Sequence, residues 1–291
     1  MNTIDMQSGS PIPVGDITNG QKYYDVLVHQ TGCSESDDTL QCLREVSDDK
    51  LKNAVDNSPS IVSYQSLNLA WLPRVDGVLL TDAPQKLVQQ AKVAKIPIVS
   101  GDSSFLAWYS RRDIEGTLFS FSTLNVTTED QIRTYIKTEF LPTISDEDLD
   151  DLLQAYPQDP AQGSPFDTGD LNAISPQFKR FASFQGDAVF QAPRRWFFEN
   201  LDGKQPIWAF LSKREKAVPI LGAFHGSDIL IRFTANLDPN GNTRISWPQY
   251  SQANPTLLTF NGRLVPQSLN KDDFRVDEMK MLNQILLANP V

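Results

Sequence analysis

The sequence is poor in histidine, cysteine and basic residues. It contains two histidines and two cysteines in 291 residues, and 26 Lys and Arg against 36 Asp and Glu, for a formal net charge of −10. A nucleic-acid-binding surface needs a basic face to neutralise phosphates. The charge balance therefore argues against nucleic acid as a partner. No cofactor motif stands out, and we expect neither a cofactor nor a metal site.

Long hydrophobic runs are also missing. No apolar stretch approaches the ~18 residues of a membrane helix, so we predict no membrane span. The first six residues lack the basic start and the apolar core of a signal peptide. We find no repeats, no low-complexity tracts and no interdomain linker. With 40% hydrophobic and 21% charged residues, the composition is that of an ordinary globular protein.

Hydrophobic periodicity predicts an α/β protein in which helices outnumber strands. A strand ends near Met6, and short apolar runs predict strands at 96–100, 207–212 and 256–260. Helices are expected at 21–30, 40–46, 51–55 and 274–288, and others begin at Pro84, Thr128, Ser145 and Ser175. A helix followed by a short apolar strand is typical of a parallel sheet. Four or five strands are few for so many helices, so the chain resembles part of a larger fold.

Cys33 and Cys42 lie close together in a polar loop, with eight residues between them. They could be two free thiols. The loop has no nearby histidine that would complete a zinc site, and the short spacing favours a disulfide. Asn125-Val126-Thr127 is an N-glycosylation sequon. Together the cysteine pair and the sequon favour the secretory pathway.

Two apolar runs end in loops that carry one ionisable group each. The run at 96–100 leads to Glu115-Gly116-Thr117, and the run at 218–221 leads to Gly222 and His225. Chemistry in open α/β sheets occurs at such strand ends, and a histidine oriented by a carboxylate is two thirds of a nucleophilic triad. His29, by contrast, falls near the end of a predicted helix, where a histidine is usually a surface residue.

Several motifs occur in order along the chain. They are Met6-Gln7-Ser8-Gly9-Ser10-Pro11, the Cys33/Cys42 pair, Trp71-Leu72-Pro73-Arg74-Val75-Asp76-Gly77, Glu115-Gly116-Thr117, Gln162-Gly163-Ser164-Pro165-Phe166-Asp167-Thr168-Gly169, Pro176-Gln177-Phe178-Lys179-Arg180 and Gly222-Ala223-Phe224-His225. Together they resemble the type-B carboxylesterase/lipase family of α/β-hydrolases, and most closely its fungal secreted lipases of the Geotrichum and Candida rugosa type. The resemblance covers nearly the whole chain and corresponds to about the C-terminal half of a family member.

The resemblance implies a role for individual residues. Glu115 matches the acid of a Ser-His-Glu triad and His225 matches its general base. Cys33 and Cys42 match a family disulfide, and Asn125 a family glycosylation site. The nucleophilic serine has no match, because Gly9-Ser10-Pro11, Gly163-Ser164-Pro165 and Gly226-Ser227-Asp228 all lack the second glycine of a G-x-S-x-G elbow.

We therefore expect residues 1–291 to form a single incomplete α/β-hydrolase domain, the C-terminal portion of the fold, with a partial, mostly parallel sheet flanked by many helices. The implied function is hydrolysis of carboxylic esters, with an ester or lipid substrate and a secreted location. The alternative is an inactive truncated or pseudo-enzyme, or an interaction module of the cholinesterase-like kind. A stretch of about ten residues separates the strand from Glu115. We still expect Glu115, and not Asp102 or Asp113, to face His225.

Overall fold

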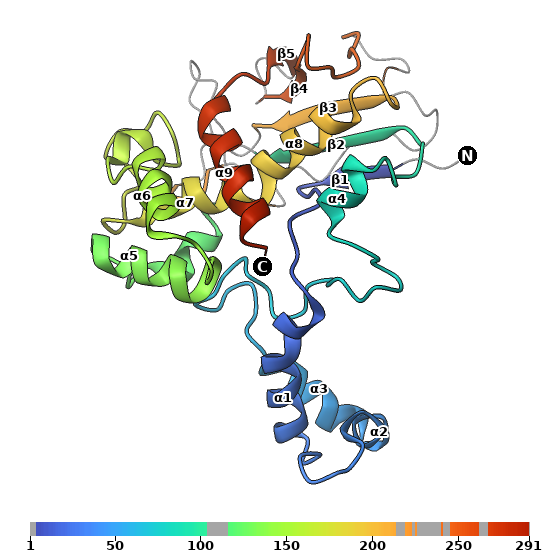
Figure 1. The fold of residues 1–291 in the computed structure, drawn as a ribbon. Helices are drawn as coiled ribbons and strands as arrows, with labels where there is room; N and C mark the ends of the chain where they lie inside the picture. The colour runs from blue at the N-terminus through green and yellow to red at the C-terminus, as the bar shows by residue number, and fades with distance from the viewer. Residues whose placement is uncertain are drawn as a thin grey trace.

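The computed structural model describes residues 4–103, 116–213, 219–222, 225, 240, 245–261 and 267–290. Its centre is one five-stranded sheet with strand order β1-β2-β3-β4-β5 (Figure 1). The first four strands run parallel and β5 runs antiparallel to β4. The bounds are Ile4–Gln7 for β1, Ile98–Ser103 for β2, Ile207–Ser212 for β3, Thr256–Phe260 for β4 and Gln267–Lys271 for β5. The predicted mostly parallel sheet is confirmed.

Strand β3 is buried on both faces, and its alternating side chains enter two separate cores. Ile207, Ala209 and Leu211 join the large core on the helical side. Trp208 and Phe210 point to the opposite face, where they join a smaller cluster with Val99, Trp247, Leu258 and Phe260. A fully buried strand, apolar except for its last residue Ser212, is therefore found at the middle of the sheet, as expected for a parallel strand covered on both sides.

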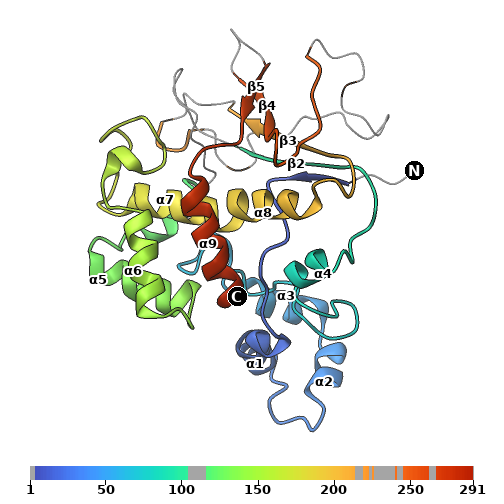
Figure 2. The same cartoon turned by 45° about the horizontal axis from the view of Figure 1, so that its top comes forward.

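A long helical run lies along one face of the sheet (Figure 2). It consists of α7 (Phe178–Gly186), a π-helical turn (Asp187–Gln191) and α8 (Ala192–Leu201). Helix α9 (Val276–Ala288) packs against α8. The helix that was predicted to begin at Ser175 begins instead at Phe178. The π-turn adds a residue to the helical ladder and shifts the face that follows it.

Two shorter helices cover the far end of that run, and the sequence signals for both are confirmed. Helix α5 (Glu129–Tyr135) starts with a complete capping box between Thr128 and Gln131. Helix α6 (Asp146–Ala155) is capped by Ser145, whose side chain accepts a hydrogen bond from the Asp148 amide. The three acidic residues of its first turn point largely to solvent, where negative charge suits the helix dipole.

Helices α1 (Gln21–Gln30), α2 (Thr39–Glu45) and α3 (Asp48–Asp56) form an arm that projects away from the sheet (Figure 1). The arm has its own small core, built around Leu27, Val28 and Leu43. The Cys33–Cys42 disulfide is confirmed, with an S–S distance of 2.09 Å and Cα atoms 5.7 Å apart. A core this small gains from a covalent cross-link.

Helix α4 (Pro84–Gln89) has the predicted proline in its first turn. The spacing of Leu87, Val88 and Ala91 predicts that all three lie on the inner face of this helix. Val88 is buried as predicted. For Ala91 the prediction is wrong, because the helix ends at Gln89 and Ala91 is exposed with φ of 56°. Within the described ranges, no helix combines the length and the hydropathy that a membrane crossing requires.

Candidate active site

Two loops that are distant in sequence meet beside the long helical run. One begins at Gly116, directly after Glu115, and the other is the turn at 219–222 that leads to His225. Thr117 Oγ1 donates a hydrogen bond to the carbonyl oxygen of Leu221 at 2.7 Å. The two segments that were predicted to carry the triad acid and the triad base are therefore directly bonded to each other.

The position after Glu115 requires glycine for a packing reason. A Cβ atom added to Gly116 would lie 2.0 Å from the carbonyl oxygen of Ala182 in helix α7. Only a residue without a side chain can approach the helix so closely. From there the chain enters a short 3₁₀-helix (Phe119–Thr123), and Ser120 Oγ donates back to the Gly116 carbonyl oxygen at 3.0 Å. The loop is thus fixed to the core at both ends.

The imidazole of His225 packs against two phenylalanine rings. Its ring centroid lies 5.4 Å from that of Phe119 and 5.2 Å from that of Phe190. Both phenylalanines are buried, and their own rings are stacked 5.9 Å apart. Phe190 belongs to the π-turn between α7 and α8. Single π-turns within helices occur frequently at functional sites, and this one brings an aromatic ring to the histidine.

Of the three carboxylates considered as the acid, Asp102 lies within the described residues, whereas Asp113 and Glu115 lie outside them. Asp102 is at the carboxyl end of β2 and is fully buried. Arg194 Nε donates to its Oδ2 at 2.8 Å. Helix α8 therefore supplies Asp102 with an arginine partner inside the large core.

Arg194 is the centre of a buried ionic network between α8 and the sheet. Its Nη1 donates to Oδ2 of Asp272 at 2.9 Å. Asp272 is the residue directly after strand β5. Asp272 also accepts from Arg195 Nη2 at 2.5 Å and from the Tyr250 hydroxyl at 3.1 Å. Burial alone would raise the pKa of Asp272, but the charges of Arg194 and Arg195 outweigh it and hold that pKa well below its usual range.

Sequence reasoning did not find this network. Asp272, Arg194 and Arg195 stand in segments that look like any polar loop and any helix. Arg194-Arg195 interrupts an otherwise aromatic stripe, and that interruption was the one available sign that charged groups enter the core.

Two predicted residues lie away from the loops that meet. His29 is exposed in the last turn of α1, as expected. Asn125 is exposed just after the 3₁₀-helix, beside a shallow pocket that is also lined by Tyr64 and Gln131. An exposed loop is where a sequon must lie to be modified.

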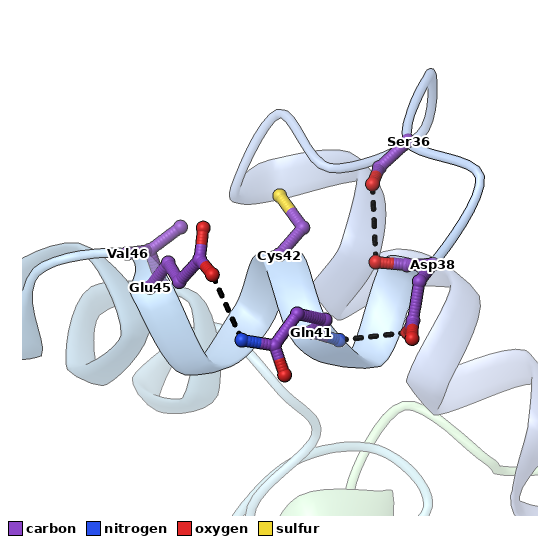
Figure 3. Close-up of a pocket in the computed structure, with 6 residues that line it drawn as sticks. All are labelled: Ser36, Asp38, Gln41, Cys42, Glu45 and Val46. Atoms are coloured by element: carbon purple, nitrogen blue, oxygen red, sulfur yellow. Dashed lines mark hydrogen bonds between the residues drawn. The ribbon is translucent and has the colours of Figure 1, made fainter.

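A second pocket lies on the arm next to the disulfide (Figure 3). Its polar groups serve helix α2: Asp38 Oδ1 caps the Gln41 amide at 2.8 Å, and the Gln41 side chain donates to Glu45 at 2.8 Å. We assign the polar residues that line this pocket a structural role, the stabilisation of helix α2. Among the described residues, no group of three or more His, Cys, Asp or Glu could hold a metal ion.

Comparison with solved structures defines the fold class. The crystal structure of Aspergillus niger EstA matches 99% of this chain and 59% of that chain, with a TM-score of 0.75 at 17% identity. The mostly parallel sheet with flanking helices is that of an α/β-hydrolase. The carboxylesterase family profile matches residues 4–243, and the chain belongs to the carboxylesterase family.

The curated relatives are fungal lipases. Lipase 4 of Diutina rugosa is 40% identical over 93% of this chain and 51% of its own length. Secreted lipase 1 of Botryotinia fuckeliana is 37% identical over 84% of this chain and 46% of its own length. The chain thus spans about half the length of the curated relatives that it matches.

Proposed function

We propose that this chain supplies the acid–base half of an ester-hydrolysing site, with His225 as the general base and Glu115 as the carboxylate that orients it. The observation that carries the proposal is the hydrogen bond from Thr117 Oγ1 to the Leu221 carbonyl. It joins the loop two residues after Glu115 to the loop four residues before His225. The engagement of Asp102 by Arg194 favours Glu115 over Asp102 as the acid.

The chemistry is acyl transfer. A serine hydroxyl attacks the ester carbonyl while His225 takes the hydroxyl proton, and the same imidazole then gives that proton to the leaving alcohol. Glu115 accepts a hydrogen bond from the other ring nitrogen and so fixes the tautomer. No G-x-S-x-G elbow occurs in the printed sequence, so the nucleophile is not assigned to any residue of this chain.

We further propose that the substrate is a carboxylic ester or lipid and that the protein is secreted and glycosylated at Asn125. The relatives are named lipases, and one of them a secreted lipase. The disulfide suits an oxidising compartment. The rings of Phe119 and Phe190 make the surroundings of His225 apolar, which suits an acyl group better than a charged substrate. Residues 1–291 would then form one incomplete hydrolase domain.

The acid–base pair is tested by following the ring protons of both histidines in an NMR titration. In Glu115→Gln the pKa of His225 should fall by about one pH unit or more, because a neighbouring carboxylate favours the charged imidazolium. His29 is the internal reference and should not change. Glu147→Gln, an exposed site in the first turn of α6, is the matched control. If the pKa of His225 falls in Asp102→Asn and does not change in Glu115→Gln, the assignment of Glu115 as the acid is rejected.

The alternative function, an inactive chain or an interaction module, is favoured by the missing elbow motif. We expect the isolated chain to give no turnover of short-chain p-nitrophenyl esters above background. A stopped assay with and without protein measures this directly. Turnover that disappears in His225→Ala would contradict the inactive alternative and support the catalytic role of His225.

A further inference from the structure

The turn that leads to His225 is strained. The Leu221 amide donates to the Pro219 carbonyl oxygen at 2.7 Å, and the central residue, Ile220, has φ of 68°. A three-residue turn with positive φ at its centre is the rare and strained form of γ-turn. Positive φ is a genuine outlier for a β-branched side chain. Such a conformation persists only where its surroundings hold it in place.

Two side chains from other parts of the chain form hydrogen bonds to this turn. Asn172 Oδ1 accepts a hydrogen bond from the Ile220 amide at 3.1 Å. Thr117 Oγ1 donates to the Leu221 carbonyl at 2.7 Å. The turn is therefore held by two side-chain hydrogen bonds, one to the amide of the strained residue Ile220 and one to the carbonyl of the residue after it.

Both of these side chains are themselves fixed. Thr117 is fully buried. Asn172 has φ of 66°, a conformation that asparagine tolerates better than most residues. The loop before it is tied to helix α7 by the buried Lys179, whose Nζ donates to Thr168 Oγ1 at 2.8 Å and to the Gly169 carbonyl at 2.7 Å. The turn is thus held by the buried Thr117 and by the half-buried Asn172, whose loop is anchored to helix α7 through Lys179.

We infer that Thr117 and Asn172 are positioning residues, which hold the Pro219–Leu221 γ-turn and thereby seat the His225 imidazole against Phe119 and Phe190. The inference rests on the proposed role of His225 as general base. Four residues after the turn the chain reaches that imidazole, whose ring centroid lies 5.4 and 5.2 Å from those of the two phenylalanines. Loss of the two hydrogen bonds that hold the turn would let the imidazole move away from Phe119 and Phe190, although His225 and Glu115 themselves are unchanged.

The experiment compares variants that remove each hydrogen bond with variants that keep it. Asn172→Gly tolerates positive φ but has no acceptor, whereas Asn172→Asp keeps the acceptor. Thr117→Val keeps the shape but has no donor, whereas Thr117→Ser keeps the hydroxyl. The readouts are amide hydrogen exchange at Ile220 and the chemical shifts of the His225 ring protons, which the currents of two aromatic rings displace from ordinary values. His29 gives the ordinary value in the same spectrum.

We expect the Ile220 amide to exchange roughly two- to tenfold faster in Asn172→Gly, the effect of losing one net hydrogen bond. In both Asn172→Gly and Thr117→Val, the His225 ring shifts should move toward those of His29. The Asp and Ser variants should remain close to the unmodified chain. Identical His225 shifts in all four variants would overturn the inference.

A further variant tests the role of the strained residue itself. Ile220→Gly removes the strain itself, because glycine adopts positive φ without cost. With glycine at position 220 the turn no longer needs the hydrogen bonds of Thr117 and Asn172. Adding Thr117→Val to Ile220→Gly should therefore change the His225 chemical shifts less than Thr117→Val does in the chain with Ile220. Equal movement in both backgrounds would also overturn the inference. The Glu115→Gln titration remains an independent test of the proposed function, since it reports charge near His225 and not the seat of the ring.

Discussion

One buried aspartate belongs to the long helical run and another contacts it from the sheet, and their pKa values move in opposite directions. Asp272, on the sheet side, accepts from Arg194, Arg195 and Tyr250, and its pKa lies well below the usual range. Asp187, at the start of the π-turn, pairs with Arg275 at 2.9 Å and accepts from the Tyr156 hydroxyl at 2.7 Å. Burial raises the pKa of Asp187, and the charges of Arg275 and Arg195 together with the Tyr156 hydrogen bond offset only part of that rise.

The two sites differ in the number of arginines in direct contact. Both side chains are almost completely removed from water. Asp272 forms ion pairs with two guanidinium groups, whereas the ion pair of Asp187 is with Arg275. At similar burial, the opposite directions of the two pKa shifts therefore follow from the charged partners.

The largest loss of unfolding free energy is expected from replacing Arg194, the arginine that pairs with both Asp102 and Asp272. Arg194→Met should destabilise the protein by about 3–5 kcal/mol, because it leaves Asp102 and Asp272 buried with a partner missing. Urea unfolding measures the loss. Arg133→Met, which removes an arginine from an exposed pair with Asp150, is the control and should hardly change the midpoint. Equal losses in the two variants would show that the network contributes no more than a surface pair.

The contributions of the two aspartates to the free energy of unfolding should change in opposite directions with pH. The folded pKa of Asp272 lies below the unfolded value of ~3.9, so its contribution is complete above that pH and is lost as the pH falls. The folded pKa of Asp187 lies above the unfolded value, so its effect on stability worsens as the pH rises through that range.

Unfolding free energies of Asp272→Asn and Asp187→Asn between pH ~3 and ~5 test this contrast. The stability deficit of Asp272→Asn relative to the unmodified chain should grow as the pH rises. The deficit of Asp187→Asn should shrink over the same range. Parallel curves for the two variants would remove the distinction between the sites.

The smallest effect concerns the two tyrosines. Tyr250→Phe and Tyr156→Phe each delete one hydroxyl donor to a buried aspartate. We expect the Tyr156 variant to lose about 1 kcal/mol more in unfolding free energy, because Asp187 has fewer other donors to replace it. Thermal unfolding of the two variants side by side measures the difference. A larger loss for Tyr250→Phe would mean that donor number does not decide the cost.

The regular elements were largely predictable from the sequence, for reasons that particular residues make clear. Strands β3 and β4 are short apolar runs, and their predicted ranges, 207–212 and 256–260, match the structure. Ser145 and the Thr128 capping box marked two helix starts correctly. Strand β5 was not predicted, because Gln-Ser-Leu-Asn-Lys at a sheet edge has no apolar alternation. The π-turn at 187–191 has no sequence signal either, since its residues fit an ordinary helix.

The candidate site was only partly predictable. Short motifs drew attention to His225 and to Gly116-Thr117, and their loops do meet. Phe119 and Phe190, which contact His225, were not predicted to lie at the site, because sequence spacing cannot show which loop a buried ring will face. The same limit applies to Arg194 and Asp272, whose partnership spans 78 positions. Long-range pairs depend on topology, which local patterns do not encode.

The strand order of the sheet has a consequence for how the protein is made. The strands lie side by side in the order in which they occur in the chain. As synthesis proceeds, each of the later strands, β2 to β5, can add to the outer edge of a sheet whose previous strand is already in place. None of these has to be inserted between two neighbours that have already paired. Domains begin to fold from the N-terminus during translation. The strand order of this sheet therefore allows simple edge growth, which ends among the described strands with the antiparallel, polar β5.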